Sequence, residues 1–221
     1  MRQQTKQHLH QMLKTLTVIL SILSISFSTI AQESDAKSDA ILEKVSAEMK
    51  ALKSFYVEFD THSKNKSTGL DQKDSGKGWV QGKKYNATLG ENVIISNGFK
   101  VWTITEETVY ITDAEDDDES SINPKKLMTI WEEGFKSKYV KEEDGQHVIN
   151  LFPTNPDDVD YHTITLYINK KDNSLKKAIM KTKDATVMTY TVSKFEKNPT
   201  IPASKFVFNK AKYPGREVIE D

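Results

Sequence analysis

The sequence contains no cysteine. This absence excludes disulfides, thiolate nucleophiles and zinc sites with thiolate ligands, and it leaves no acceptor for a lipid anchor on the chain itself. Common catalytic and nucleotide-binding signatures are absent as well: the sequence has no Gly-x-Ser-x-Gly element, no phosphate-binding loop and no Gly-x-Gly-x-x-Gly fingerprint. The chain therefore offers few of the usual starting points for an enzymatic function.

Residues 1–31 have the pattern of a secretory signal peptide. Arg2, Lys6 and Lys14 form a basic leader, residues 16–30 form an apolar run interrupted by serines, and Ala31 ends a small-x-small cleavage site. The alternative is a membrane anchor, but this run is shorter than the ~20 residues of a typical span. We expect cleavage after Ala31 and a mature protein, residues 32–221, in the periplasm, where a domain of this size folds without disulfides.

The charge balance gives no reason to expect nucleic-acid binding. The chain has 31 basic and 32 acidic residues, and the three basic residues of the leader leave 28 against 32, a net charge of −4. A mildly acidic surface lacks the basic patch that binds phosphates. The length of residues 32–221 fits a single domain, which we expect to be monomeric.

The mature chain opens with an amphipathic helix. Ser38 is a candidate N-cap and Asp39 suits the first turn. One apolar stripe follows at helical spacing: Ile41, Leu42, Val45, Met49 and Leu52. Such a stripe needs another element to cover it.

Alternating patterns then predict a succession of short strands. They begin with residues 55–62 and continue near 76–88, 93–96, 100–105, 108–112, 138–142, 146–152, 161–169, 175–183, 186–195 and 206–208. Short connections at 97–98, 144–145, 172–173 and 183–185 predict antiparallel hairpins. Between the two sets, Asn123-Pro124 predicts a second helix that ends at Gly134 and carries Leu127, Met128 and Trp131.

These elements predict a mainly β (α+β) fold: an incompletely closed antiparallel barrel of about ten or eleven strands with a helical lid. The apolar sheet either fills its own core or encloses an apolar cavity, and the residues alone leave both possibilities open. They predict no cofactor, no metal site and no catalytic residues. His62, His147 and His162 lie on different predicted strands, without a second ligand nearby in sequence. The acidic run 113–119 is interpreted as a solvated loop, with weak Ca²⁺ binding as the alternative.

The order of short motifs resembles the family of periplasmic outer-membrane lipoprotein carriers, the LolA family. The motifs extend from Ala40 to Ile219. They are Ala40-Ile41-Leu42, Lys53-Ser54-Phe55, Gly78-Trp79-Val80, Ser96-Asn97-Gly98 before Trp102, Asn123-Pro124 before Leu127-Met128, residues 148–153, Phe206-Val207-Phe208, and residues 214–219.

The resemblance implies a half-barrel whose apolar face and lid hold the acyl chains of a lipoprotein. It also implies a donor, an ABC transporter of the inner membrane, and an acceptor at the outer membrane. On this hypothesis the cavity is formed by the lid residues Ile41, Leu42, Val45, Met49, Leu52, Leu127, Met128 and Trp131 and by the sheet residues Phe55, Val57, Phe59, Trp79, Trp102 and Ile104.

One position departs from the family pattern. Family members carry an Arg-Pro pair after the Trp-Val strand, and that arginine helps to latch the lid. Here the region reads Gln81-Gly82-Lys83-Lys84-Tyr85. Lys83 or Lys84 is the candidate replacement, although an ammonium group lacks the planar fork of a guanidinium. Two rival hypotheses are a lipid-sensing envelope module that acts through a protein partner, and a lipid hydrolase that uses one of the three histidines.

Overall fold

The computed structural model describes residues 35–114 and 128–220. These ranges contain one α-helix, α2 (Ala36–Ala51), and twelve strands. The first half holds β1 (Ser54–Asn65), β2 (Leu70–Gln81), β3 (Lys84–Leu89), β4 (Asn92–Ser96), β5 (Lys100–Ile104) and β6 (Thr108–Asp113). The second half holds β7 (Phe135–Glu143), β8 (Gln146–Pro153), β9 (Tyr161–Asn169), β10 (Leu175–Thr182), β11 (Val187–Lys197) and β12 (Glu217–Glu220).

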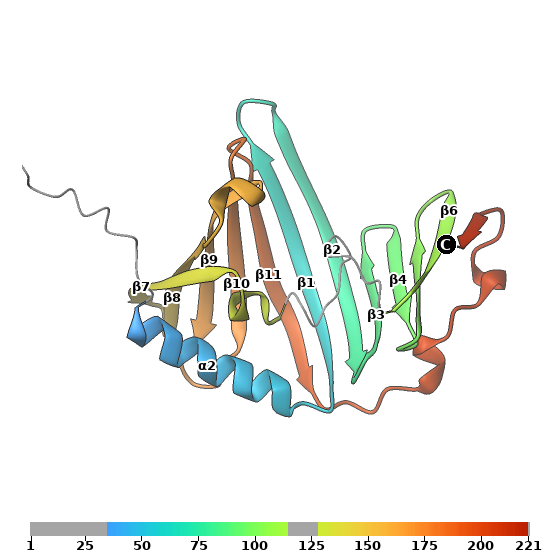
Figure 1. The fold of residues 1–221 in the computed structure, drawn as a ribbon, viewed down its shortest axis with the longest axis horizontal. Coiled ribbons are helices and arrows are strands. Elements are labelled where there is room, and N and C mark those ends of the chain that lie inside the picture. The colour runs from blue at the N-terminus through green and yellow to red at the C-terminus, as the bar shows by residue number, and fades with distance from the viewer. Residues whose placement is uncertain (1–34, 115–127, 221) are drawn as a thin grey trace, which may run out of the picture. The chain divides into compact units, whose positions relative to one another are not determined.

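All twelve strands belong to one sheet that is not closed. Its order is β12-β6-β5-β4-β3-β2-β1-β11-β10-β9-β8-β7, so the edge strands are β12 and β7. Figure 1 shows α2 lying across one face of the β7–β11 half. The predicted half-barrel with a helical lid is therefore confirmed, with twelve strands in place of ten or eleven. No helix in the described ranges has the length and apolar character needed to cross a bilayer.

The predicted hairpins are present, and their turns use backbone conformations that suit their residues. Asp144 and Gly145 have φ values of 50° and 71°, which is the geometry of a two-residue turn between β7 and β8. Between β4 and β5, the Asn97 side chain accepts hydrogen bonds from the backbone N–H groups of Phe99 and Lys100. Gly98 beside it has a φ of 90°, which favours glycine.

The strand predicted over residues 76–88 is two strands in the structure. Gly82, with a φ of 60°, turns the chain between Gln81 and Lys84, which pair directly with each other. The buried positions change phase at this turn, from Gly78 and Val80 to Tyr85 and Ala87, which the sequence prediction overlooked. The strand predicted at 206–208 is also wrong: Ala203–Phe206 form a 3-10 helix, and the true last strand, β12, follows later.

β12 makes a parallel pair with β6, with Val218 opposite Val109. The expectation of a wholly antiparallel sheet is therefore wrong at this edge. A parallel neighbour needs a long connection rather than a hairpin, and here the long C-terminal segment that includes Ala203–Phe206 and the 3-10 helix Lys210–Lys212 provides it.

The predicted second helix is only partly within the described ranges. Of residues 123–134, those up to Leu127 lie outside them, and Ile130–Glu132 form a 3-10 helix rather than an α-helix. Gly134, with a φ of 77°, ends this segment before β7. We call residues 128–133 the lid segment. The predicted signal peptide and acidic residues 115–119 also lie outside the described ranges.

The first helix begins three residues earlier than predicted. Asp35 is the N-cap, and its side chain accepts a 2.8 Å hydrogen bond from the Lys37 backbone N–H. Ser38 is instead fully buried within the first turn. Its hydroxyl lies 2.5 Å from that of Ser137 on β7, and the Ser137 hydroxyl donates to Asp39 at 2.5 Å. This polar contact fixes the start of α2 on the edge strand.

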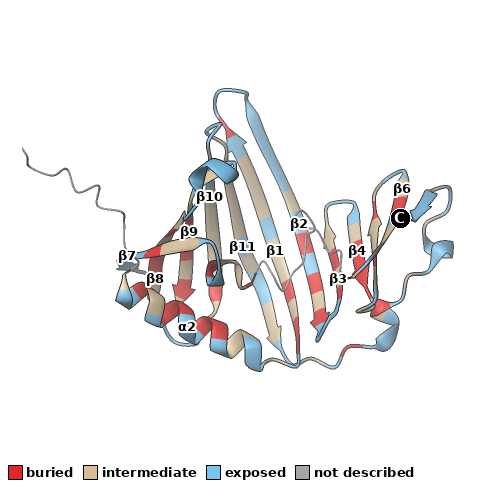
Figure 2. Cartoon of the chain, in the orientation of Figure 1, coloured by how far each residue is buried: buried red, intermediate tan, exposed pale blue. Residues whose placement is uncertain are grey.

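Apolar residues form two separate cores, one on each face of the sheet. The larger core lies on the face covered by α2 and includes Ile41, Leu42, Val45, Phe55, Val57, Ile149, Leu151, Ile164, Leu166 and Ile168. The smaller core comprises Ile95, Ile104 and Val109, with Trp102, Phe208 and Tyr213 packed against it. Figure 2 shows that buried residues concentrate where α2 crosses the strands and become sparse toward the tip of the β1–β2 hairpin.

Candidate functional site: an apolar cavity between sheet and lid

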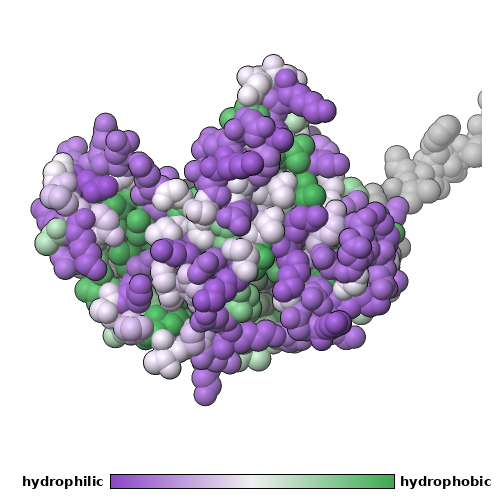
Figure 3. All heavy atoms as spheres, turned by 180° about the vertical axis from the view of Figure 1, so that it is seen from behind, coloured by the Kyte–Doolittle hydropathy of each residue, from purple (hydrophilic) through white to green (hydrophobic). Residues whose placement is uncertain are grey.

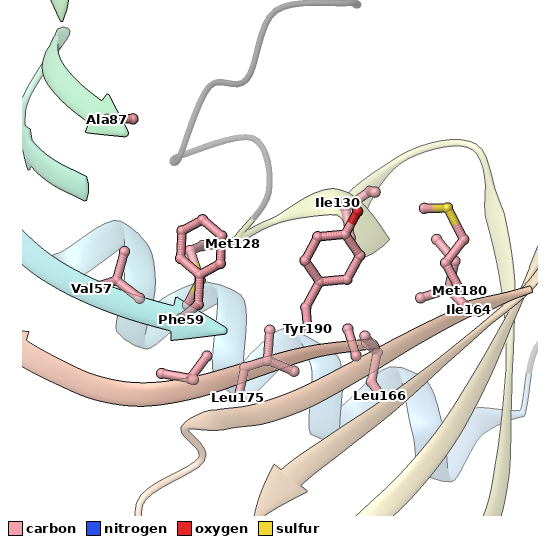
Figure 4. A pocket seen from close by; sticks show the side chains of 12 residues that line it. Val57, Phe59, Ala87, Met128, Ile130, Ile164, Leu166, Leu175, Met180 and Tyr190 are labelled. Carbon is pink, nitrogen blue, oxygen red and sulfur yellow. The ribbon is translucent and has the colours of Figure 1, made fainter. Parts of the chain in front are cut away.

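A cavity lies between the sheet and the lid segment, with an empty space of about 870 Å³ when its open mouth is included. Its sheet wall comes from β1, β3, β9, β10 and β11, and its other side from the lid segment (Figure 4). The lining residues are Val57, Phe59, Ala87, Met128, Ile130, Ile164, Leu166, Leu175, Ala178, Met180, Tyr190 and Val192.

Strand alternation explains why these side chains converge. On β1, Val57 and Phe59 face the cavity, while Tyr56 points to the other face. The residues opposite Val57 and Phe59 on β2 are Gly78 and Gly76. The Phe59 ring lies over Gly76, where even a Cβ atom would be only 2.8 Å from its Cε2. The absence of side chains at Gly76 and Gly78 on β2 therefore leaves space for the ring of Phe59.

The cavity is closed at the α2 end and opens away from it. Near α2, Val45, Met49 and Leu52 meet Leu175 and Phe195 around a smaller hollow. Burial then decreases along the strands in the direction away from the helix. Val57 and Leu175 are buried, whereas Phe59, Met180 and Tyr190 farther along β1, β10 and β11 are half-buried.

The lid segment is attached to α2 by two polar contacts. The indole N–H of Trp131 donates to the Ser46 hydroxyl at 2.9 Å, and both residues are buried. On the surface, the Lys50 ammonium lies 3.0 Å from the Glu132 carboxylate. The helix and the lid segment therefore form one cover.

A third polar contact joins α2 to the sheet. The Glu48 carboxylate accepts hydrogen bonds from Asn173 at 2.7 Å and from Lys197 at 2.9 Å. The Asn173 hydrogen bond, with the help of Lys197, holds the pKa of Glu48 below its ordinary value of 4.5. The carboxylate is thus held in the ionised form that both contacts require.

Among the described residues that line the cavity, Tyr190 alone has a polar side-chain atom. Figure 4 shows its ring standing off β11 with the hydroxyl directed away from the strand. Burial raises the pKa of this hydroxyl above its ordinary value of 10.0, so it remains protonated at neutral pH. All other lining side chains are aliphatic, aromatic or thioether groups, which suits an apolar occupant.

The structure brings most of the predicted cavity residues to this side of the sheet. Val57, Phe59 and Met128 line the cavity itself. Val45, Met49, Leu52 and Phe55 line two smaller hollows beside α2, while Ile41, Leu42 and Trp131 are buried on the side of the cover that faces the sheet. Leu127 lies outside the described residues.

Trp79, Trp102 and Ile104 lie on the opposite face of the sheet. Trp79 packs on the Tyr56 ring, with a centroid distance of 4.8 Å, and Trp102 stacks on Phe208 at 5.6 Å. Ile104 is fully buried in the smaller core. Alternation separates two groups of residues in a strand, but it does not say which group faces which side, and both faces of this sheet are apolar at these strands.

Most of the cavity wall comes from residues that the sequence reasoning did not select, chiefly on β9, β10 and β11. The signal was present in part: Ile164, Leu166 and Ile168 alternate with other strand residues, and all three are buried. Tyr190 gave no such signal, because its neighbours Thr189 and Thr191 are common strand residues on either face.

The rear face in Figure 3 is mostly hydrophilic, with hydrophobic atoms visible in strips between the polar ones.

On the outer side of β3, the C-terminal segment is attached by a hydrogen bond from the Asn86 amide to the Lys205 carbonyl at 2.7 Å. Farther along the segment, the Arg216 guanidinium donates to the Thr105 carbonyl at 2.6 Å. This segment covers the smaller core.

The other candidate groups are dispersed. His62 lies on β1 and pairs with Asp71. His147 lies on β8 and contacts Tyr139, whereas His162 lies on β9 and contacts Thr163. Within the described residues, no group of three or more histidine, aspartate or glutamate side chains is arranged to hold a metal ion. Lys83 and Lys84 are exposed at the β2–β3 turn, and the lid contacts within the described ranges come instead from Ser46 and Lys50.

The fold and the cavity define a class of protein: an open, mainly antiparallel half-barrel with an apolar cavity under a helix. The particular family follows from the sequence. The chain belongs to the LolA family, because the profile of "Outer membrane lipoprotein carrier protein LolA" matches residues 50–209. This is a family of carrier proteins. No curated protein sequence matches the chain.

Several solved structures are similar to this chain at low sequence identity. An uncharacterized conserved protein from Thermus thermophilus is 10% identical, with a TM-score of 0.54, over 84% of this chain and 99% of that one. The LolA superfamily protein NE2245 from Nitrosomonas europaea is 12% identical, with a TM-score of 0.40 and coverages of 77% and 97%. LprF from Mycobacterium bovis is 16% identical, with a TM-score of 0.45 and coverages of 77% and 98%.

Proposed function

We propose that this protein is a periplasmic chaperone for lipoproteins, which shields their acyl chains in the cavity during transport from the inner to the outer membrane. The observation that carries the proposal is the cavity itself: an apolar space in a member of a lipoprotein carrier family, to which the described residues contribute one polar side-chain atom. The proposed activity is binding and transfer, without a chemical step.

The energetics of the cargo fit such a site. Burial of a methylene group is worth about 0.8 kcal/mol, so one chain of about sixteen carbons gains roughly 10 kcal/mol when it leaves water. A carrier must match this gain and still release the chain. The lid segment is held on α2 by the contacts of Ser46 and Lys50, and a short segment held in this way can move away from the sheet at modest cost.

The proposal includes export by the signal peptide and two protein partners. The donor is an ABC transporter of the inner membrane, and the acceptor is a protein of the outer membrane. Residues 32–221 then act as a single monomeric domain. The cavity residues proposed to contact acyl chains are Val57, Phe59 and Met128, with Met49 and Leu52 at the α2 end.

The decisive experiment has a binding arm and a transfer arm. The mature protein is purified from cells and analysed for bound lipid or lipoprotein by mass spectrometry, and it is then tested for extraction of lipoproteins from spheroplasts. We expect acylated cargo in the first arm and release of lipoproteins in the second. Phe59→Asp places a charge in the cavity and should abolish both, whereas Lys66→Asp, at the exposed tip of the β1–β2 hairpin, is the matched control.

The absence of acylated cargo together with failure to extract lipoproteins would refute the carrier proposal. Bound lipid without any transfer would leave a lipid-binding module that acts through a protein partner. Hydrolysis of an ester probe that is lost on replacing His62, His147 or His162 would instead identify an enzyme.

A further inference from the structure

The Tyr190 hydroxyl is an isolated polar group in a cavity whose other described lining residues have apolar side chains. The side chain is half-buried, and its hydroxyl forms no hydrogen bond with the described residues. Thr61, which is opposite Tyr190 on β1, donates its own hydroxyl to the Asp74 carbonyl. A half-buried hydroxyl without a protein partner loses hydrogen bonds to water when an apolar ligand fills the cavity.

The position of Tyr190 along the cavity is also informative. It lies on the open side, because Val192 and then Phe195 separate it from the α2 end of β11. An acyl chain that enters from the open side places its methyl end toward α2. Its carbonyl, which joins the chain to the rest of the lipid, then remains at the level of Tyr190.

We propose that Tyr190 is a binding residue that donates a hydrogen bond to the carbonyl oxygen of an ester- or amide-linked acyl chain. The cavity would thereby distinguish an acyl group from a plain hydrocarbon chain of the same length. This inference rests on the proposed function, since it names the part of the cargo that the cavity recognises. The hydroxyl is the donor, because its raised pKa keeps the proton on it.

The inference can be tested with pairs of ligands that differ only at the carbonyl. One pair is a lipopeptide with two ester-linked palmitoyl chains and its analogue with two ether-linked hexadecyl chains. The second pair is a short-chain diacyl phosphatidylcholine and its dialkyl ether. Each ligand displaces a fluorescent fatty acid from the mature protein, and from the variants Tyr190→Phe and Tyr56→Phe. Tyr56 is the control, because its ring lies on the other face of the sheet.

The wild-type protein and Tyr56→Phe should bind the ester form about fivefold more tightly than the ether form. This factor corresponds to one net hydrogen bond of about 1 kcal/mol. Tyr190→Phe should bind both forms equally. It should also fold normally, since the hydroxyl has no partner among the described residues. The ligand pair with the larger effect would identify lipoprotein or phospholipid as the source of the acyl group.

Equal ester preference in the wild type and in Tyr190→Phe would overturn the inference while the carrier proposal stands. Equal binding of the two forms by the wild-type protein would overturn it as well. Failure of the wild type to bind any of the four ligands would refute the carrier proposal, and this inference with it.

Discussion

At Gly76 the sheet carries no side chain on its inner face, and the Phe59 ring lies over this position. A Cβ atom at Gly76 would be 2.7 Å from the Thr88 carbonyl oxygen and 2.8 Å from Cε2 of Phe59. The backbone there is ordinary, so the requirement for glycine comes from contact and not from a positive φ. The width of the cavity near β1 and β2 depends on this close approach.

Gly76→Ala should therefore push the Phe59 ring into the cavity. We expect a loss of about 1–3 kcal/mol in the free energy of unfolding, which is typical of overpacking, and weaker binding of a fatty-acid probe. Urea denaturation and probe titration measure the two effects. The double variant Gly76→Ala/Phe59→Leu should recover binding of the probe, because the smaller leucine side chain leaves room for the added Cβ atom without moving into the cavity. Full probe affinity in the single variant would show that Phe59 does not set the width.

At the scale of elements, α2 and the lid segment act as one cover because Trp131 donates to Ser46. Removing one partner leaves the other buried without its hydrogen bond. Trp131→Phe and Ser46→Ala should each lower the free energy of unfolding, and the hydrogen bond itself should account for about 1 kcal/mol of coupling between them. A double-mutant cycle in urea measures this coupling. Purely additive effects would mean that the contact does not join the two elements.

The attachment of α2 through Glu48 should depend on pH. The pKa of Glu48 is lowered in the folded protein, so its contribution to stability is present above the ordinary value of 4.5 and is lost as the pH falls through the folded-state pKa. Because the side chain is about 40% exposed, the contribution is limited to roughly 0.2–1 kcal/mol.

Comparison of the wild type with Glu48→Gln isolates this contribution from those of other carboxylates. The stability difference between the two proteins in urea should be present at pH 7 and should shrink progressively below pH 4.5. The measurement is unfolding followed by circular dichroism at a series of pH values. A difference that stays constant across the series would contradict the role of the charged form.

At the scale of the whole molecule, the two faces of the sheet have separate tasks. The face under α2 carries the cavity, and the other face carries the smaller core covered by Phe208 and Tyr213, whose rings stack at 5.8 Å. Phe208→Ala should cost roughly 2 kcal/mol of stability, yet leave the affinity for a fatty-acid probe unchanged. Phe59→Ala should weaken probe binding.

Titration of both variants with the same probe, well below their unfolding temperatures, tests the separation. Fluorescence of Trp102, which stacks on Phe208, reports the repacking on the outer face. A strong loss of probe affinity in Phe208→Ala would mean that the smaller core and the cavity are coupled through the sheet.

The sequence was sufficient to predict the half-barrel, α2 and the hairpins, because alternation, turn residues and helical spacing are local signals. The family followed separately, from the resemblance carried by the order of short motifs. It could not assign faces: Trp79, Trp102 and Ile104 alternate as regularly as Val57 and Phe59 but point the other way. It also missed β12, whose partner β6 is about a hundred residues earlier in the chain. Contacts at such separation leave no local pattern, and the polar network of Ser38, Ser137 and Asp39 is of the same kind.

The order of strands in the sheet has a consequence for how the protein reaches this state. Nine of the eleven strand pairs join strands that are consecutive along the chain, and the exceptions are β1 with β11 and β6 with β12. Two meanders, β1–β6 and β7–β11, can therefore form from local contacts. The joining of β1 to β11 and the addition of β12 close long stretches of chain, which makes them the slow steps of folding. Until β11 has paired with β1, the wall of the cavity remains in two separate parts, and a chain arrested before that step has no complete cavity.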